Sequence, residues 1–215
     1  MSYQVEGNRI VTKIEEYDKK RSKVYLDEEF AFLLYKGELS EYKIMQGKTI
    51  TEDIYNQIVR EVLVKRAKKR CLNLLQKKNY TEYKLREKLQ EGLYSTEIED
   101  EVIAYVKSFR YVDDYRYACD YIFYHKEFET KKIIEDKLKR KGIDSSVLQQ
   151  AFMDSYDDGE ELEKELEQAN KLLKKKRFDS ESMDWKEKQK IYAYLLRKGI
   201  TSSVIKRAMM LFDDI

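Results

Sequence analysis

Two adjacent aspartates, Asp113 and Asp114, are the side chains that most invite a catalytic interpretation. A pair of carboxylates can act as general acid and general base when both face one substrate. Adjacent residues at a helix start point in different directions, however. Asp113 is instead placed to accept backbone N–H groups as an N-cap, and Asp114 adds negative charge where the helix dipole is positive. We therefore expect both aspartates to cap a helix.

Other common catalytic and metal-binding sets are incomplete in this sequence. His125 is the only histidine, and there is no Gly-x-x-x-x-Gly-Lys loop. A histidine metal cluster, a Ser-His-Asp triad and a phosphate-binding loop therefore lack their parts. Cys71 and Cys119 fall within helical patterns, where small buried hydrophobes are expected rather than a disulfide or metal pair. We expect no enzyme, cofactor or bound metal.

Basic residues gather in three runs, although the formal net charge is only +2. Residues 60–78 hold eight basic side chains, 131–141 hold six and 171–177 hold five, whereas 154–167 hold eight acids and one lysine. Most charge runs are simply solvated faces of a helix. Three in succession favour contact with DNA phosphates or an acidic protein surface.

The chain repeats itself, which indicates the elements that must position these runs. Lys141–Val147 (KGIDSSV) and Lys198–Val204 (KGITSSV) agree at six of seven positions, 57 residues apart. A weaker copy 49 residues before the first includes the capping box Thr96-x-x-Glu99. We predict three helices in each unit: 52–77, 81–91 and 96–108; 113–126, 130–140 and 144–155; and 160–177, 184–198 and 201–213.

The start of the chain reads differently. Apolar residues alternate at Ile10–Ile14, and two further apolar segments flank the turn-like Asp27–Glu29, which predicts a small β-hairpin or three-stranded sheet. A short helix from Leu39 to Gln46 would stop at Gly47.

The fold class expected is mainly α, with tandem three-helix repeats forming an elongated, curved body behind this sheet. A three-helix unit of about 50 residues is marginal alone, so neighbouring units should stack. The predicted division is an N-terminal β-containing extension at 1–50 and three-helix repeats at 51–109, 110–156 and 157–215. No signal peptide or apolar run long enough for a membrane span is present. We expect a soluble, cytoplasmic monomer.

With the repeats in place, the sequence resembles the RecX family of recombination regulators, which are built from tandem three-helix repeats. Tyr111–Ala118 resembles the family's Gly-Tyr-Leu-Asp-Asp-x-Arg-Phe-Ala, and Ile134–Ile143 resembles its basic helix ending in Lys-Gly-Ile. Tyr83–Leu89 fits the corresponding helix of a first repeat. Tyr25–Phe32 is similar to the extension that many members carry before the repeats.

The likeness is firm over about residues 67–152 and looser outside it. Arg110 and Glu28 stand where the family usually has glycine, and Thr130 lies near another customary glycine. The resemblance implies a modulator that binds RecA recombinase filaments along their groove and limits filament growth, ATPase activity and strand exchange. It also implies direct DNA contact in some members and no catalysis.

The candidate binding residues are cations on the corresponding middle helices of the three units: Arg86, Lys88, Lys131, Lys132, Lys137, Lys139, Arg140, Lys141, Arg197 and Lys198. Their partner would be a RecA filament, or single- or double-stranded DNA without sequence preference. The alternative function is a stand-alone DNA-binding helical-repeat protein that acts by occupying DNA. A generic scaffold for unrelated proteins is a third and less specific possibility.

Residues of the central motif are expected to be structural: Tyr111, Asp113, Asp114, Arg116, Tyr117 and Ala118. Arg116 is placed to form an ion pair within the first helical turn, and an exposed binding role is the alternative. Most tyrosines, including Tyr105, Tyr117 and Tyr121, fall near helical apolar spacing and should lie in the core or between modules rather than stack on bases. Trp185 is expected to anchor the start of a helix in the third unit.

Overall fold

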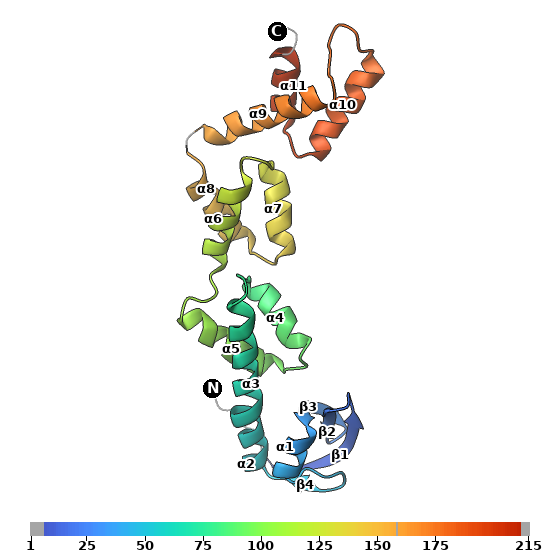
Figure 1. Ribbon diagram of the computed structural model, residues 1–215, viewed down its shortest axis with the longest axis vertical. Helices are drawn as coiled ribbons and strands as arrows, with labels where there is room; N and C mark the ends of the chain where they lie inside the picture. The colour runs from blue at the N-terminus through green and yellow to red at the C-terminus, as the bar shows by residue number, and fades with distance from the viewer. Residues whose placement is uncertain (1–6, 158, 212–215) are drawn as a thin grey trace. The chain divides into compact units, whose positions relative to one another are not determined.

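The computed structural model describes residues 7–157 and 159–211. The chain divides into two compact units, one ending at Val112 and the other beginning at Asp113 (Figure 1). The structure is mainly helical, with a small antiparallel sheet in the first unit, as the sequence predicts.

The sheet of the first unit has the strand order β3-β2-β1-β4. Its strands are β1 (Arg9–Glu16), β2 (Arg21–Leu26), β3 (Glu29–Tyr35) and β4 (Thr49–Ile50). The predicted three strands are therefore present, and the short β4, which the sequence pattern missed, pairs with β1. The β2–β3 turn has positive φ at both Asp27 (49°) and Glu28 (74°), as a type I′ hairpin requires. Helix α1 (Lys36–Glu41) begins and ends earlier than predicted, before Gly47 with its φ of 80°.

One long helical run packs on this sheet. Thr51 caps it by accepting a hydrogen bond from the Ile54 N–H, and α2 (Glu52–Gln57) then continues into a π-helical segment, η1 (Ile58–Val64), and α3 (Lys65–Leu75). The sequence predicts this run as one helix but gives no sign of the π-helical turns. Helices α4 (Glu82–Gln90) and α5 (Thr96–Ser108) complete the unit.

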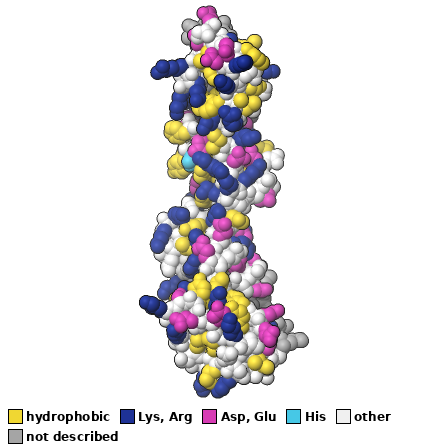
Figure 2. Space-filling view, turned by 90° about the vertical axis from the view of Figure 1, so that its right-hand side faces the viewer, with side chains coloured by type: hydrophobic (Ala, Val, Ile, Leu, Met, Phe, Trp, Pro, Cys, Tyr) yellow, Lys and Arg dark blue, Asp and Glu magenta, His cyan; other side chains and the backbone are white. Residues whose placement is uncertain are grey.

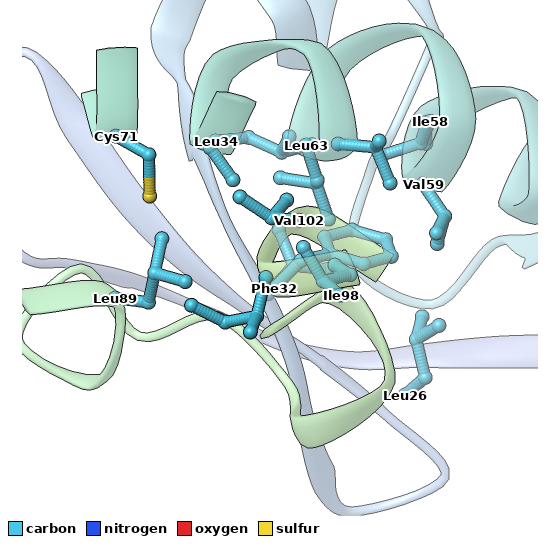
Figure 3. Packing of buried hydrophobic residues seen from close by; sticks show 14 of the residues in the cluster. Leu26, Phe32, Leu34, Ile58, Val59, Leu63, Cys71, Leu89, Ile98 and Val102 are labelled. Atoms are coloured by element: carbon cyan, nitrogen blue, oxygen red, sulfur yellow. The ribbon is translucent and has the colours of Figure 1, made fainter. Parts of the chain in front are cut away.

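Sheet and helices of the first unit share a single hydrophobic core. Figure 3 shows Phe32 and Leu34 of β3 beside Leu63 of η1 and Val102 of α5. Cys71 is fully buried in this core as a free thiol, and burial raises its pKa to about 11. The expected role of Cys71 as a small buried hydrophobe is confirmed.

The second unit contains two groups of three helices, each with its own core. The second repeat consists of α6 (Asp114–His125), α7 (Lys131–Arg140) and α8 (Ser145–Ser155). The third repeat consists of α9 (Glu160–Lys175), α10 (Trp185–Arg197) and α11 (Ser202–Leu211). Residues 212 and 213 of the last predicted helix lie outside the described residues. The prediction for Trp185 was wrong: its side chain is 71% exposed, because Asp184 and Glu187 form a capping box that starts α10 without it.

Six helices in the described part of the chain end in the same left-handed turn. A residue directly after the C-cap, or two positions after it in α4, has positive φ. Its N–H donates to the carbonyl three residues back, and the next N–H donates to the carbonyl five residues back. The left-handed residues are Lys43, Leu93, Arg110, Gly142, Arg177 and Gly199. Glycine adopts this conformation without strain, whereas other residues adopt it at a cost. Position 110, where the family usually has glycine, is thus left-handed, and Arg110 adopts this conformation with a φ of 55°.

Side chains at the start of α7 lie directly against the backbone at the end of α10. The Thr130 hydroxyl donates a hydrogen bond of 2.7 Å to the carbonyl of Lys198. A Cβ on Gly199 would lie 2.6 Å from Thr130 Oγ1 and 2.8 Å from Lys132 Cβ. Only glycine allows both the left-handed turn and this contact. The second and third repeats are therefore held together through α7 and α10.

Gln168 of α9 joins the same two repeats. Its side chain is 8% exposed, and Nε2 donates to the carbonyls of Lys126 and Glu129 at 3.0 Å each. Beside it, the Lys126 ammonium lies 2.7 Å from the Glu160 carboxylate. One buried amide thus satisfies two carbonyls at the end of α6 and in the loop after it.

Replacing Arg110 with glycine should stabilise the protein. The change removes a strained left-handed residue, so the free energy of unfolding in urea should rise by about 1 kcal/mol. Ser108→Gly is the matched control, because Ser108 is exposed and helical, and glycine there should lower stability by about 0.5–1 kcal/mol. Equal losses in both variants would contradict the strain at Arg110.

Gln168→Glu should disrupt the junction between the second and third repeats. A carboxylate has no hydrogen to donate and would face two backbone carbonyls, so we expect a loss of about 2–4 kcal/mol in unfolding free energy. The same substitution at Gln189, which is exposed on α10, should change it by less than about 0.5 kcal/mol. Equal effects at the two glutamines would show that the buried amide does not stabilise the junction.

Candidate functional site

Helix α7 carries six of the predicted binding residues on or next to it. Thr130 caps the helix, and Ile134 and Leu138 face the core of the second repeat, so the basic residues occupy the remaining faces. The apolar residues at helical spacing thus fix which face of α7 is buried, and the basic side chains are left on the other faces, as the sequence predicts.

Three of these six cations have carboxylate partners. Lys131 lies 2.7 Å from Glu161 of α9. Lys137 lies 2.6 Å from Glu129, and Lys139 lies 2.5 Å from Glu135. These hydrogen bonds raise the pKa values of Lys137 and Lys139 above their ordinary value, so both stay charged but neutralised.

The other three cations of this set are differently placed. Lys132 and Arg140 are exposed, and no described carboxylate lies within ion-pair distance of either side chain. The Lys141 ammonium lies 5.6 Å from the ring centroids of both Tyr117 and Tyr121, which is cation–π distance. Lys132 and Arg140 are thus the cations of α7 most available to an external anion.

The third repeat presents an equivalent pair. Arg197 and Lys198 stand 57 positions after Arg140 and Lys141, and they end α10 in the same left-handed turn. Both are exposed, and the Lys198 ammonium lies 5.8 Å from the centroid of the Tyr194 ring. Because α10 ends against the start of α7, the structure brings Arg197 and Lys198 into the neighbourhood of Lys132.

The first repeat offers less free charge. Arg86 of α4 pairs with Glu82 at 2.9 Å and Asp100 at 2.6 Å, and Lys88 pairs with Glu91 at 2.6 Å. Burial works against the charge of Arg86, but its hydrogen bonds to Asp100 and Glu82 outweigh this effect and raise its pKa. In Figure 2, lysines and arginines are interspersed with carboxylates on the surface of both units.

The central motif behaves as a helix start. Asp113 caps α6 by accepting a 2.9 Å hydrogen bond from the Arg116 N–H, and Asp114 is the first residue of the helix. Ala118 is fully buried in the core of the second repeat. The ion pair predicted for Arg116 does not form with any described carboxylate, and the side chain is exposed, as the alternative expects; a binding role for it stays a prediction.

Tyrosines follow the structural prediction. Tyr105, Tyr117 and Tyr121 are partly buried against the hydrophobic cores of their units. Tyr111 is 53% exposed and stacks on Phe109, with ring centroids 5.6 Å apart. The half-buried Cys119 is a free thiol, less enclosed than predicted.

Exposed aromatic residues after the motif were missed. Phe123 and Tyr124 are 66% and 71% exposed at the end of α6, and Phe128 in the α6–α7 loop is 83% exposed. The sequence contains a usable signal, because adjacent aromatics such as Phe123 and Tyr124 cannot both follow one apolar helix face.

Two absences apply to residues 7–157 and 159–211. Within these ranges, no group of three or more histidine, cysteine or acidic side chains is arranged to hold a metal ion. No helix there has the length and apolar character needed to cross a membrane.

Comparison with known families identifies two of the repeats. Residues 67–105 match the first three-helix domain of RecX, and residues 163–209 match its third three-helix domain. The first of these segments covers α3 to α5, and the second covers α9 to α11.

Similar proteins extend the match over nearly the whole chain. Regulatory protein RecX of Clostridioides difficile is 30% identical over 207 residues, covering 93% of this chain and 94% of its own. Regulatory protein RecX of Listeria monocytogenes serotype 4a is 26% identical over 197 residues, covering 91% of this chain and 72% of its own.

Solved structures show the same fold. A crystal structure of regulatory protein RecX matches with a TM-score of 0.61 and 25% identity, covering 96% of this chain and all of that one. RecX from Lactobacillus salivarius matches with a TM-score of 0.59 and 25% identity, covering 71% of this chain and 97% of its own. This chain therefore belongs to the RecX family of regulatory proteins.

Proposed function

We propose that this protein binds the filament that RecA recombinase forms on DNA and modulates, mostly inhibits, its ATPase and strand-exchange activities. Its setting would be recombination and DNA repair. Family membership supports the recombinase as partner. The observation that carries the proposal is the repeated arginine–lysine pair, Arg140–Lys141 and Arg197–Lys198, at the ends of α7 and α10.

Arginine at these positions suits a nucleoprotein surface. A guanidinium can donate two parallel hydrogen bonds to a phosphate or carboxylate, and both groups occur on a protein–DNA filament. Arg140 and Arg197 are exposed, and neither has a carboxylate partner among the described residues. Their charge is therefore available without breaking an internal ion pair.

Lysines that have partners can contribute once contact is made. Lys131 and Lys139 are 40% and 47% exposed in their ion pairs, and solvent-exposed pairs contribute only about 0–1 kcal/mol each. An array of phosphates can compete for such lysines. Lys132, Arg140 and Arg197 would make the first contacts, and the paired lysines would follow.

The alternative is a DNA-binding protein that acts by occupying DNA alone. The exposed Phe123 and Tyr124, whose ring centroids lie 5.5 Å apart, favour it, because aromatic side chains beside cations can stack on bases of a single strand. The two functions differ in whether recombinase itself is bound.

Charge reversal at the repeated arginines should weaken inhibition. In an ATPase assay of the cognate RecA recombinase on single-stranded DNA, the unaltered chain should lower the rate at near-stoichiometric amounts. The double variant Arg140→Glu/Arg197→Glu should need at least about tenfold more protein, equivalent to about 1.4 kcal/mol. Lys186→Glu/Lys190→Glu is the matched control, since both lysines are exposed on α10 and the net charge changes equally.

No effect of the unaltered chain at any ratio would refute the proposed function. Equal weakening by the arginine and lysine double variants would refute the specific role of Arg140 and Arg197. Inhibition that persists without measurable affinity for recombinase, and follows DNA occupancy, would favour the alternative.

Salt dependence separates phosphate contacts from protein contacts. If Lys132, Arg140 and Arg197 each meet one phosphate of a single strand, log affinity for DNA should fall against log salt with a slope of about −2. Arg140→Glu should make this slope less steep by at least about 0.7. Fluorescence anisotropy with a labelled oligothymidylate measures the slope for the unaltered chain and for the variant. An affinity that does not change with salt would assign these cations to protein contacts.

A further inference from the structure

A groove in the second unit is lined by Lys198 of the second repeated pair but by neither of the repeated arginines. It encloses about 690 Å³ and is formed by the α6–α7 loop, α7, α9 and the end of α10. Ile133 of α7, Leu172 of α9 and Tyr194 of α10 supply its apolar surface. This volume is in the range of sites that hold small ligands or a few side chains of a partner.

Phe128 makes the groove unusual, because it lines the groove and is nevertheless 83% exposed. Phe128 lies in a loop whose backbone is fixed by the hydrogen bond that the Gln168 side chain donates to the Glu129 carbonyl. An exposed aromatic ring on a fixed loop beside apolar side chains is typical of a binding surface.

The side chains of the groove that carry an unpaired charge are lysines. Its two acids are already paired, Glu127 with Lys164 at 2.6 Å and Glu129 with Lys137 at 2.6 Å. Lys175 has no ion-pair partner among the described residues.

Two further lysines add to this charge. Lys171 lies 3.8 Å from Glu167, and both side chains are largely exposed, so the pair is weak. Lys198 contacts the ring of Tyr194, whose other neighbour is Lys176 at 4.6 Å from the centroid. An occupant therefore meets several ammonium groups around an apolar surface.

We propose that this groove binds an acidic segment of a partner protein that carries an apolar side chain among its carboxylates. The apolar side chain would pack against Phe128, Ile133 and Leu172, and the carboxylates would pair with Lys171, Lys175 and Lys198. Phosphate chains fit less well, because the apolar surface of the groove offers them no favourable contact. The inference goes beyond the proposed function, since it requires neither DNA nor recombinase.

Binding of a synthetic peptide to the full chain tests the groove. The probe is a fluorescein-labelled peptide of aspartates and glutamates that includes one leucine and one phenylalanine, followed by fluorescence anisotropy. We expect saturable binding, lost when the acids are changed to amides or the two apolar residues to glycine. Phe128→Ser and Lys175→Glu should each weaken binding at least tenfold.

Matched variants in the same unit control for fold and net charge. Tyr124→Ser removes another exposed aromatic ring, and Lys190→Glu reverses another exposed lysine, and neither lines the groove. Both should bind the acidic peptide as the unaltered chain does. The inference is overturned if the peptide does not bind, if the control variants weaken it equally, or if the amide peptide binds as well. It is also overturned if the Phe128→Ser and Lys175→Glu variants lose binding of oligothymidylate but keep binding of the peptide.

Discussion

The left-handed turn that ends a helix is the constraint on which the described structure depends, because the chain has no proline to stop its helices. The turn places an apolar residue two positions beyond the C-cap against the last core leucine, as Ile143 follows Leu138 and Ile200 follows Leu195. It thereby sets the direction of the next helix. At the ends of α7 and α10 it also leaves an exposed arginine, so the feature that defines the repeat also presents its charge.

Ion pairs within the chain neutralise many of the clustered basic residues, so few cations remain available to an external partner. The acidic start of α9 meets lysines of the second repeat in the pairs Lys126–Glu160 and Lys131–Glu161, and Lys164 of α9 pairs with Glu127 of the α6–α7 loop. These pairs and the buried Gln168 amide attach the third repeat to the second. Counting basic residues in the sequence therefore overstates the binding surface, and geometry selects a smaller set for contact.

Local signals made most of the helices predictable. Helix starts at Thr51, Asp113, Thr130, Asp144 and Asp184 have capping side chains, and each predicted helix of the three units agrees with the structure within two residues where it is described. The π-helical segment, strand β4 and the exposure of Trp185 depend on tertiary packing, which apolar spacing does not encode. The same holds for the groove beside Phe128, which combines segments from four parts of the chain. The four-part division of the chain stays a prediction.

Hydrogen–deuterium exchange of the full chain, with and without the cognate RecA filament on single-stranded DNA, shows whether the filament binds at the ends of α7 and α10. Binding through the repeated helix ends should slow amide exchange around residues 138–143 and 195–200, where the left-handed turns carry Arg140 and Arg197. Recombinase without DNA and DNA without recombinase separate the two possible partners. Slower exchange confined to the first unit, or no change in any segment, would contradict the account.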